Sequence, residues 1–249
     1  VVKNVAGYDL SKLFTGSFGS LGVILEATFK LAPLPLESRT VVAKGLDSVT
    51  VRKAVSAVTA SQLVPSSLEV QGPPFSLLAR FEGSQRASER QVVEVVKLWQ
   101  RWGVKSSILS GSAEIECWRH HHDIVWGRVG DVCRIGFLPV DMPDILEKLG
   151  ILLRRHGSGG WVAGRAGIGV IHARLGTDAG VSKLIVEELR SMLASSAGYV
   201  VLLRGSPELR ANIDAWGPLG DAKRVMGAVK RQFDPNGILS PGQWPIEVT

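Results

Sequence analysis

The sequence lacks several features that would mark special classes of protein. It has two cysteines, Cys117 and Cys133, and neither lies in a CxxC or other metal-ligand spacing. No apolar run approaches the roughly 20 residues that a membrane-spanning helix needs, and no secretory signal peptide is visible. The sequence therefore predicts neither a disulfide framework nor a metal site, and it favours a cytoplasmic protein with both cysteines as small core residues.

The sequence also lacks a concentrated run of one charge. Lys and Arg number 29 against 23 Asp and Glu, so the formal net charge is only +6. The basic residues punctuate helical patterns, which is typical of a solvated face and argues against a nucleic-acid partner. A moderate positive balance is also compatible with an anionic cofactor or an acid substrate.

The middle of the chain repeats one order of predicted elements. Each half reads β-α-β-β-α-β, the order of the ferredoxin-like split βαβ unit, although the two halves show no sequence identity. A sheet with helices on one face would bury each amphipathic helix once. The strands are expected at 38–44, 68–71, 75–81, 104–109, 131–138, 161–164, 167–175 and 199–204, and the helices at 47–63, 87–102, 143–156 and 181–193.

The segments outside these halves have their own patterns. Residues 23–31 are predicted to form a strand that Pro33 and Pro35 end. Residues 219–233 carry apolar residues at helical spacing, and Asp234-Pro235-Asn236-Gly237 ends that helix because proline cannot continue it. The chain begins with Val1 inside a motif, so we expect a fragment whose natural N-terminal part precedes it.

A glycine-rich stretch from Gly16 to Gly22 is the first candidate ligand site. Three glycines at i, i+3 and i+6 let the backbone approach a ligand without a Cβ clash, and successive N–H groups in such a turn can bind an anion. The spacing is neither the dinucleotide-binding G-x-G-x-x-G nor a P-loop. Taken alone, an ordinary tight turn explains these glycines equally well.

The motifs around the glycine-rich stretch indicate a particular protein family. An N-x-x-G-Y-D-L element precedes L-x-x-G-S-x-G-x-L-G-x-I, and K-x-x-F-D-P-x-G-I-L-S-P-G closes the chain. In this order the elements resemble those of the vanillyl-alcohol oxidase/p-cresol methylhydroxylase (PCMH) flavoprotein superfamily, and within it the FAD-binding E subunit of glycolate oxidase. Ser240 stands where the family has Asn. The residues that carry the resemblance are Asn4, Gly7, Tyr8, Asp9, Leu10, Leu13, Gly16, Ser17, Gly19, Leu21, Gly22, Ile24, Lys230, Phe233, Asp234, Pro235, Gly237, Ile238, Leu239, Pro241 and Gly242.

The resemblance implies a fold and a cofactor. It implies an α+β protein in which residues 1–36 end a PCMH-type FAD-binding domain and residues 37–218 form a duplicated ferredoxin-like cap. Residues 219–249 would return to the FAD domain. The resemblance also implies FAD contacts from Asn4, Ala6, Gly7, Tyr8, Asp9, Gly16, Ser17, Gly19, Ser20, Gly22, Val23 and Ser240.

The resemblance further implies an activity. The expected reaction is oxidation of a small 2-hydroxy acid such as glycolate, with hydride transfer to flavin N5. The alternative is a non-catalytic FAD-binding or electron-relay subunit of a multi-subunit oxidase. In either case the expected partners are further oxidase subunits, namely a second flavoprotein and an iron–sulfur subunit.

The candidate catalytic residues lie in predicted strands. Related enzymes have an H-x-x-x-x-G-N-x-H element, of which only His172 corresponds here, so a base is expected rather than a metal site. A hydrogen-bonded structural histidine is the other reading of His172. Arg134, Arg165 or Arg204 could clamp a substrate carboxylate or form ordinary salt bridges. The run His120-His121-His122 is expected in a surface or helical segment, because adjacent side chains diverge.

Overall fold

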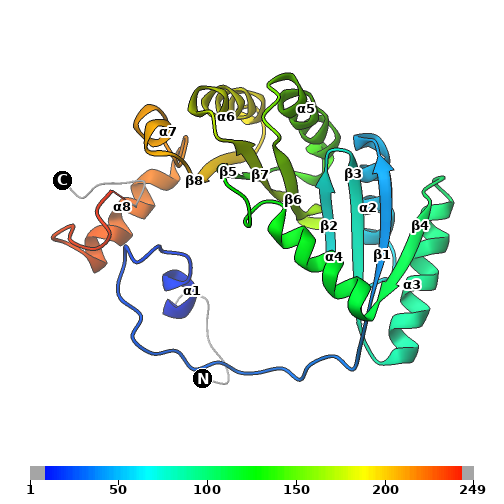
Figure 1. Ribbon diagram of the computed structural model, residues 1–249. Helices are drawn as coiled ribbons and strands as arrows, with labels where there is room; N and C mark the ends of the chain where they lie inside the picture. Colours follow the sequence, from blue (N-terminus) through cyan, green and yellow to red (C-terminus); the bar gives the residue numbers. More distant parts are fainter. Residues whose placement is uncertain (1–8, 243–249) are drawn as a thin grey trace. The chain divides into compact units, whose positions relative to one another are not determined.

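A computed structural model describes residues 9–242 (Figure 1). The chain divides into two compact units. One contains residues 1–32 and 218–249, and the other contains Pro33–Gly217. The predicted boundaries were 36/37 and 218/219. Each unit is described separately below.

The larger unit is built on an eight-stranded sheet. Its order is β4-β1-β3-β2-β6-β7-β5-β8, and all neighbouring strands are antiparallel. The first four strands and the last four join where β2 pairs with β6. Counted outward from this pair, the first group runs β2-β3-β1-β4 and the second runs β6-β7-β5-β8, so the two groups have the same order. The strands are β1 Glu37–Leu46, β2 Ser67–Gly72, β3 Phe75–Gly83, β4 Ser106–Ser110, β5 Asp131–Gly136, β6 Trp161–Arg165, β7 Val170–Gly176 and β8 Tyr199–Arg204.

Most of the predicted helices are present within one or two residues of their expected ends. Asp47 caps the start of α2, since its carboxylate accepts a hydrogen bond of 2.6 Å from the Thr50 N–H. Short helices α1 and α7 and the 3₁₀ turns were not predicted. The helices are α1 Leu10–Phe14, α2 Ser48–Thr59, α3 Gln85–Gln100, α4 Gly111–Asp123, α5 Met142–Arg155, α6 Ala179–Leu193, α7 Pro207–Asn212 and α8 Ala222–Phe233, with 3₁₀ turns η2 Pro139–Asp141 and η3 Ala166–Ile168.

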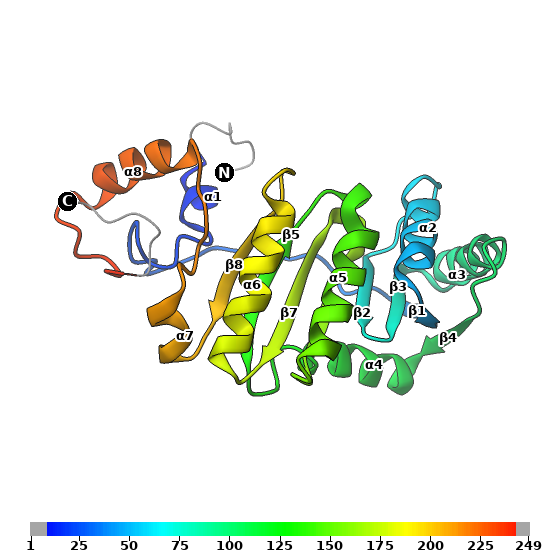
Figure 2. The same ribbon diagram turned by 90° about the horizontal axis from the view of Figure 1, so that it is seen from above.

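The two faces of the sheet have different cover. Helices α2, α3, α5 and α6 pack on one face and form the main apolar core with the inward residues of the strands. Helix α4 lies on the opposite face (Figure 2). Successive strand residues alternate between the faces. Cys133 and Ile135 therefore point into the core, while Arg134 between them points to the face that carries α4.

Several sequence predictions differ from the structure; the strand expected at 167–175, for example, begins only at Val170, after the 3₁₀ turn η3. Residues 23–31 form no strand; Val23, Leu25 and Leu31 are at least 73% exposed. A strand needs a partner for its backbone groups, and none of the described strands pairs with this segment. Trp102, the last residue of the helix predicted at 87–102, lies beyond the end of α3 and is half-exposed, whereas Trp99 within α3 is buried. Cys117 is only half-buried.

Within residues 9–242, no helix has both the length and the apolar character needed to cross a membrane.

Candidate functional site

In the smaller unit, the glycine-rich stretch and the tail motif form one local structure. The Lys230 ammonium, 3% exposed, donates to the Ser20 carbonyl oxygen at 2.7 Å and to the Leu239 carbonyl at 3.0 Å. It also pairs with the Asp234 carboxylate at 2.6 Å. Hydrogen bonding to Lys230 holds the Asp234 pKa below its usual value. One lysine thus joins two segments that lie 210 residues apart in sequence.

The glycines of this stretch have different roles. Gly16 and Gly19 have φ of +82° and +70°, a region that side chains disfavour. A Cβ at Gly16 would contact nothing within 4 Å, so its backbone is open to a ligand. A Cβ at Gly22 would come 2.6 Å from the Phe14 ring, so this glycine allows internal packing. A flavin would therefore have room to approach the backbone at Gly16, whereas the Phe14 ring occupies the space beside Gly22.

The other predicted cofactor residues fall in several places. Asn4, Ala6, Gly7 and Tyr8 lie outside the described residues. The Asp9 carboxylate caps α1 by accepting from the Lys12 N–H at 3.2 Å. Ser17 and Ser20 are buried in the turn, and Val23 is exposed. Ser240 lies beside Gly19, with its hydroxyl 3.1 Å from where a Gly19 Cβ would be.

In the larger unit, a pocket of about 470 Å³ lies between the sheet and the α4 segment. Strand register brings both predicted catalytic residues into it, because Arg134 on β5 lies directly opposite His172 on β7. Trp126 stacks obliquely on His172, with ring centroids 5.3 Å apart. Arg165 of β6 also lines the pocket. Imidazole and guanidinium groups therefore face one cavity.

The environment of His172 determines its protonation. Burial lowers the imidazole pKa, and the neighbouring Arg134 and Arg165 cations lower it further against the opposing effect of Glu69. The ring is therefore neutral near pH 7 and can accept a proton. The pocket therefore holds a group that can accept a proton next to a guanidinium that can bind an anion.

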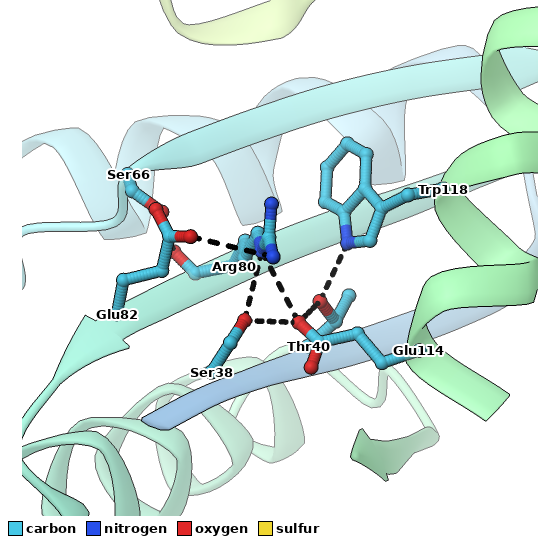
Figure 3. Close-up of polar contacts among 7 residues, drawn as sticks. All are labelled: Ser38, Thr40, Ser66, Arg80, Glu82, Glu114 and Trp118. Carbon is cyan, nitrogen blue, oxygen red and sulfur yellow. Dashed lines mark hydrogen bonds and ion pairs between the residues drawn. The ribbon is translucent and has the colours of Figure 1, made fainter. Parts of the chain in front are cut away.

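A buried carboxylate anchors α4 on the sheet (Figure 3). Glu114 Oε1 accepts hydrogen bonds from the Ser38 and Thr40 hydroxyls, at 2.6 and 2.7 Å, and from Arg80 Nε at 3.2 Å. One turn later, Trp118 Nε1 donates to Thr40 at 2.8 Å. The helix therefore meets the sheet through polar contacts, and these place its last turn beside the pocket.

Arg204, for which a carboxylate clamp and an ordinary salt bridge were both open, binds backbone carbonyls instead. Its guanidinium donates to the carbonyls of Val125, Trp126, Arg128 and Gly130 at 2.6–3.3 Å. These contacts hold the loop between α4 and β5, which carries Trp126. Arg204 is therefore committed to backbone carbonyls, whereas Arg134 and Arg165 line the pocket.

Several polar residues that line the pocket were not predicted as site residues. Glu69 lies on β2, and its carboxylate is 3.7 Å from Nε2 of His121 in the last turn of α4. His121 Nδ1 is 2.8 Å from the Gln71 amide oxygen. His121 and His122 both line the pocket, as part of the helical segment that was expected. The alternation of β2 could have placed Glu69 and Gln71 on one face of the sheet. It could not have shown that His121 of α4 contacts both of them.

Comparisons with known proteins agree with the motifs. Residues 220–244 match the family model described as FAD linked oxidases, C-terminal domain. Glycolate oxidase subunit GlcD of Bacillus subtilis (strain 168) is 38% identical over 78 residues, which is 31% of this chain and 17% of that protein. Glycolate oxidase subunit GlcE of Escherichia coli (strain K12) is 38% identical over 88 residues, which is 34% of this chain and 23% of that protein. The aligned segments thus span less than a quarter of either relative.

The fold has counterparts among solved structures. The structure of p-cresol methylhydroxylase with substrate bound superposes with a TM-score of 0.61 at 14% identity, over 88% of this chain and 55% of that one. The chain is therefore similar to the flavoproteins of the vanillyl-alcohol oxidase/p-cresol methylhydroxylase superfamily, for which FAD is the indicated cofactor. Within that class, its sequence is similar to glycolate oxidase subunits.

Proposed function

We propose that this chain belongs to an FAD-dependent oxidoreductase that oxidises a small 2-hydroxy acid such as glycolate. The observation that carries the proposal is the pairing of His172 and Arg134 in one pocket. The similarity to glycolate oxidase subunits supports the same class of substrate.

The two side chains have complementary roles in this proposal. Arg134 binds the substrate carboxylate, since a planar guanidinium can donate two parallel hydrogen bonds to it. The neutral His172 imidazole takes the hydroxyl proton as the C2–O bond becomes a carbonyl. FAD, when bound, would accept the C2 hydride at N5. The proton and the two electrons that leave the substrate are thus accounted for.

The flavin contacts in this proposal come from the smaller unit. The open backbone at Gly16 and the turn through Ser17 and Gly19 would approach the cofactor, with Ser240 beside them. Lys230 would hold the two segments together. The two β-α-β-β-α-β halves would form the ferredoxin-like cap, and the partners would be further oxidase subunits, including a second flavoprotein and an iron–sulfur subunit, in the cytoplasm.

The direct test uses the full natural chain with its cofactor, purified apart from the other oxidase subunits so that only its own flavin is observed. The purified protein should show the visible absorbance of bound FAD, and anaerobic addition of glycolate or lactate should bleach it. The His172→Gln variant should keep the absorbance and bleach far more slowly. A colourless holoprotein, or a flavin that no 2-hydroxy acid reduces, contradicts the proposal.

A second candidate function is electron relay without substrate oxidation. The similarity to the GlcE subunit of Escherichia coli (strain K12) favours it, because glycolate oxidase of the same strain also has a GlcD subunit. Reconstitution distinguishes the two. If the His172→Gln variant supports full activity in the assembled complex, while loss of bound flavin from this chain stops electron transfer, the relay role holds.

A further inference from the structure

The pocket between the sheet and the α4 segment has more arginines than carboxylates in its lining. Among the residues that line it, Glu69 is the one carboxylate, and Arg134 and Arg165 are the two guanidinium groups. Of the three histidines that line the pocket, His172 is held neutral because burial and its cationic neighbours lower its pKa. The guanidinium groups therefore outnumber the carboxylates by one.

Strand register determines which of these residues lie opposite each other. Glu69 on β2 lies directly opposite Arg165 on β6, and Arg134 on β5 lies directly opposite His172 on β7. Directly opposed residues have their Cβ atoms about 5 Å apart. Among the described residues the Glu69 carboxylate forms no ion pair with Arg165, so its charge remains at the β2 end of the pocket. At the β5 end, Arg134 faces the neutral His172 ring and packs against the Tyr199 ring, and it has no carboxylate partner within residues 9–242.

The Glu69 carboxylate is held in place. Its side chain is 12% exposed, and His121 Nε2 lies 3.7 Å from it. His121 is itself held by Gln71 and by the Trp118 ring, whose centroid is 5.5 Å away. Because α4 is anchored on the sheet through Glu114, this arrangement keeps a negative charge at the β2 end of the pocket.

We propose that the pocket selects monocarboxylates and that Glu69 is the specificity-determining residue that rejects a second carboxylate. The proposal rests on the proposed function, in which a 2-hydroxy acid occupies this pocket. The substrate carboxylate binds Arg134, and the hydroxyl on the next carbon reaches His172 on the adjacent strand. A second carboxylate further along the substrate comes close to the Glu69 carboxylate. Two negative charges that are close together in a partly desolvated site repel each other strongly.

The test measures binding rather than turnover. Propionate and glutarate are suitable probes, because neither has a hydroxyl group to oxidise. Calorimetric titration of the holoprotein should show propionate binding more tightly than glutarate. Glu69→Gln, which keeps the side-chain shape, should strengthen glutarate binding by about tenfold or more and change propionate binding by less than about threefold.

Two further variants make the test specific. Glu82→Gln is the matched control, since Glu82 is another half-buried strand glutamate that pairs with Arg80 outside the pocket; it should leave both affinities unchanged. Arg134→Gln should abolish propionate binding. Equal affinity of the native protein for both probes, an unchanged preference in Glu69→Gln, or undiminished binding in Arg134→Gln overturns the inference.

The outcome separates the inference from the proposed function. If the pocket prefers propionate through Glu69 but no 2-hydroxy acid reduces the flavin, the proposed reaction fails and the selectivity stands. If 2-hydroxy acids reduce the flavin and dicarboxylates bind as well as monocarboxylates, the reaction stands and the role of Glu69 fails.

Discussion

At the scale of single residues, His172 provides the most direct test of chemistry. Burial and the Arg134 cation lower its imidazole pKa below 6.5. The neutral base is therefore present at pH 7, and kcat/KM should fall only as the pH drops through that lowered pKa. His172→Gln should reduce kcat by about 10²- to 10⁴-fold and remove this acidic limb.

The pKa itself can be measured separately from activity. An NMR titration of the His172 ring should give a midpoint below 6.5, and Arg134→Gln should raise it because a nearby cation is removed. A midpoint above 6.5, or a pH profile that His172→Gln leaves unchanged, contradicts the assignment of His172 as the base.

Ser240 provides a second prediction at this scale. Its φ of +45° lies in the left-handed region, which costs most side chains about 1–2 kcal/mol, whereas Asn adopts it more readily. Ser240→Asn should therefore raise the free energy of unfolding by up to about 1 kcal/mol, measured by urea denaturation. Ser240→Ala keeps the strain and should give no gain. A destabilised Asn variant would show that this strain does not limit stability.

At the scale of elements, α4 depends on one buried carboxylate. Glu114 is the residue of this helix that is fully buried, and it accepts from Ser38, Thr40 and Arg80. Glu114→Ala leaves these donors without their acceptor and should lower the free energy of unfolding by about 1–3 kcal/mol. Urea denaturation measures the loss, and amide hydrogen exchange should rise over 111–123.

The same helix offers a matched control. Glu116 pairs with Arg119 at 2.6 Å, and both side chains are more than 60% exposed. Glu116→Ala should therefore change the free energy of unfolding by less than about 0.5 kcal/mol. Equal effects from the two substitutions would show that the polar anchor does not hold α4.

The elements were largely predictable from local pattern. The helical spacing over 47–63 led directly to α2, and the strand predicted at 38–44 lies within β1, although residues 40–43 of that strand are all buried and do not alternate. Residues 23–31 show the limit of this reasoning. Their alternation is strand-like, but a strand exists only with a hydrogen-bonded neighbour, and the local sequence does not specify one.

At the scale of the whole chain, the first of the two connections between the units should be the first site of proteolysis. Residues 23–36 are exposed and have no regular structure, and Lys30 lies within them. Brief trypsin digestion should therefore cut first after Lys30, as mass spectrometry of the fragments would show. Lys30→Gln should slow this cut without changing later ones. First cleavage inside the sheet unit contradicts the expectation.

The sequence by itself determined the repeated order of strands and helices and the two end motifs that resemble FAD-linked oxidases. Both are local properties: periodicity decides which residues are inward, and each motif occupies a short stretch. Only the tertiary structure decided that Lys230 joins those motifs and that His172, Arg134 and Glu69 share a pocket. These pairings depend on strand register and on contacts between residues far apart in sequence, which local spacing does not encode.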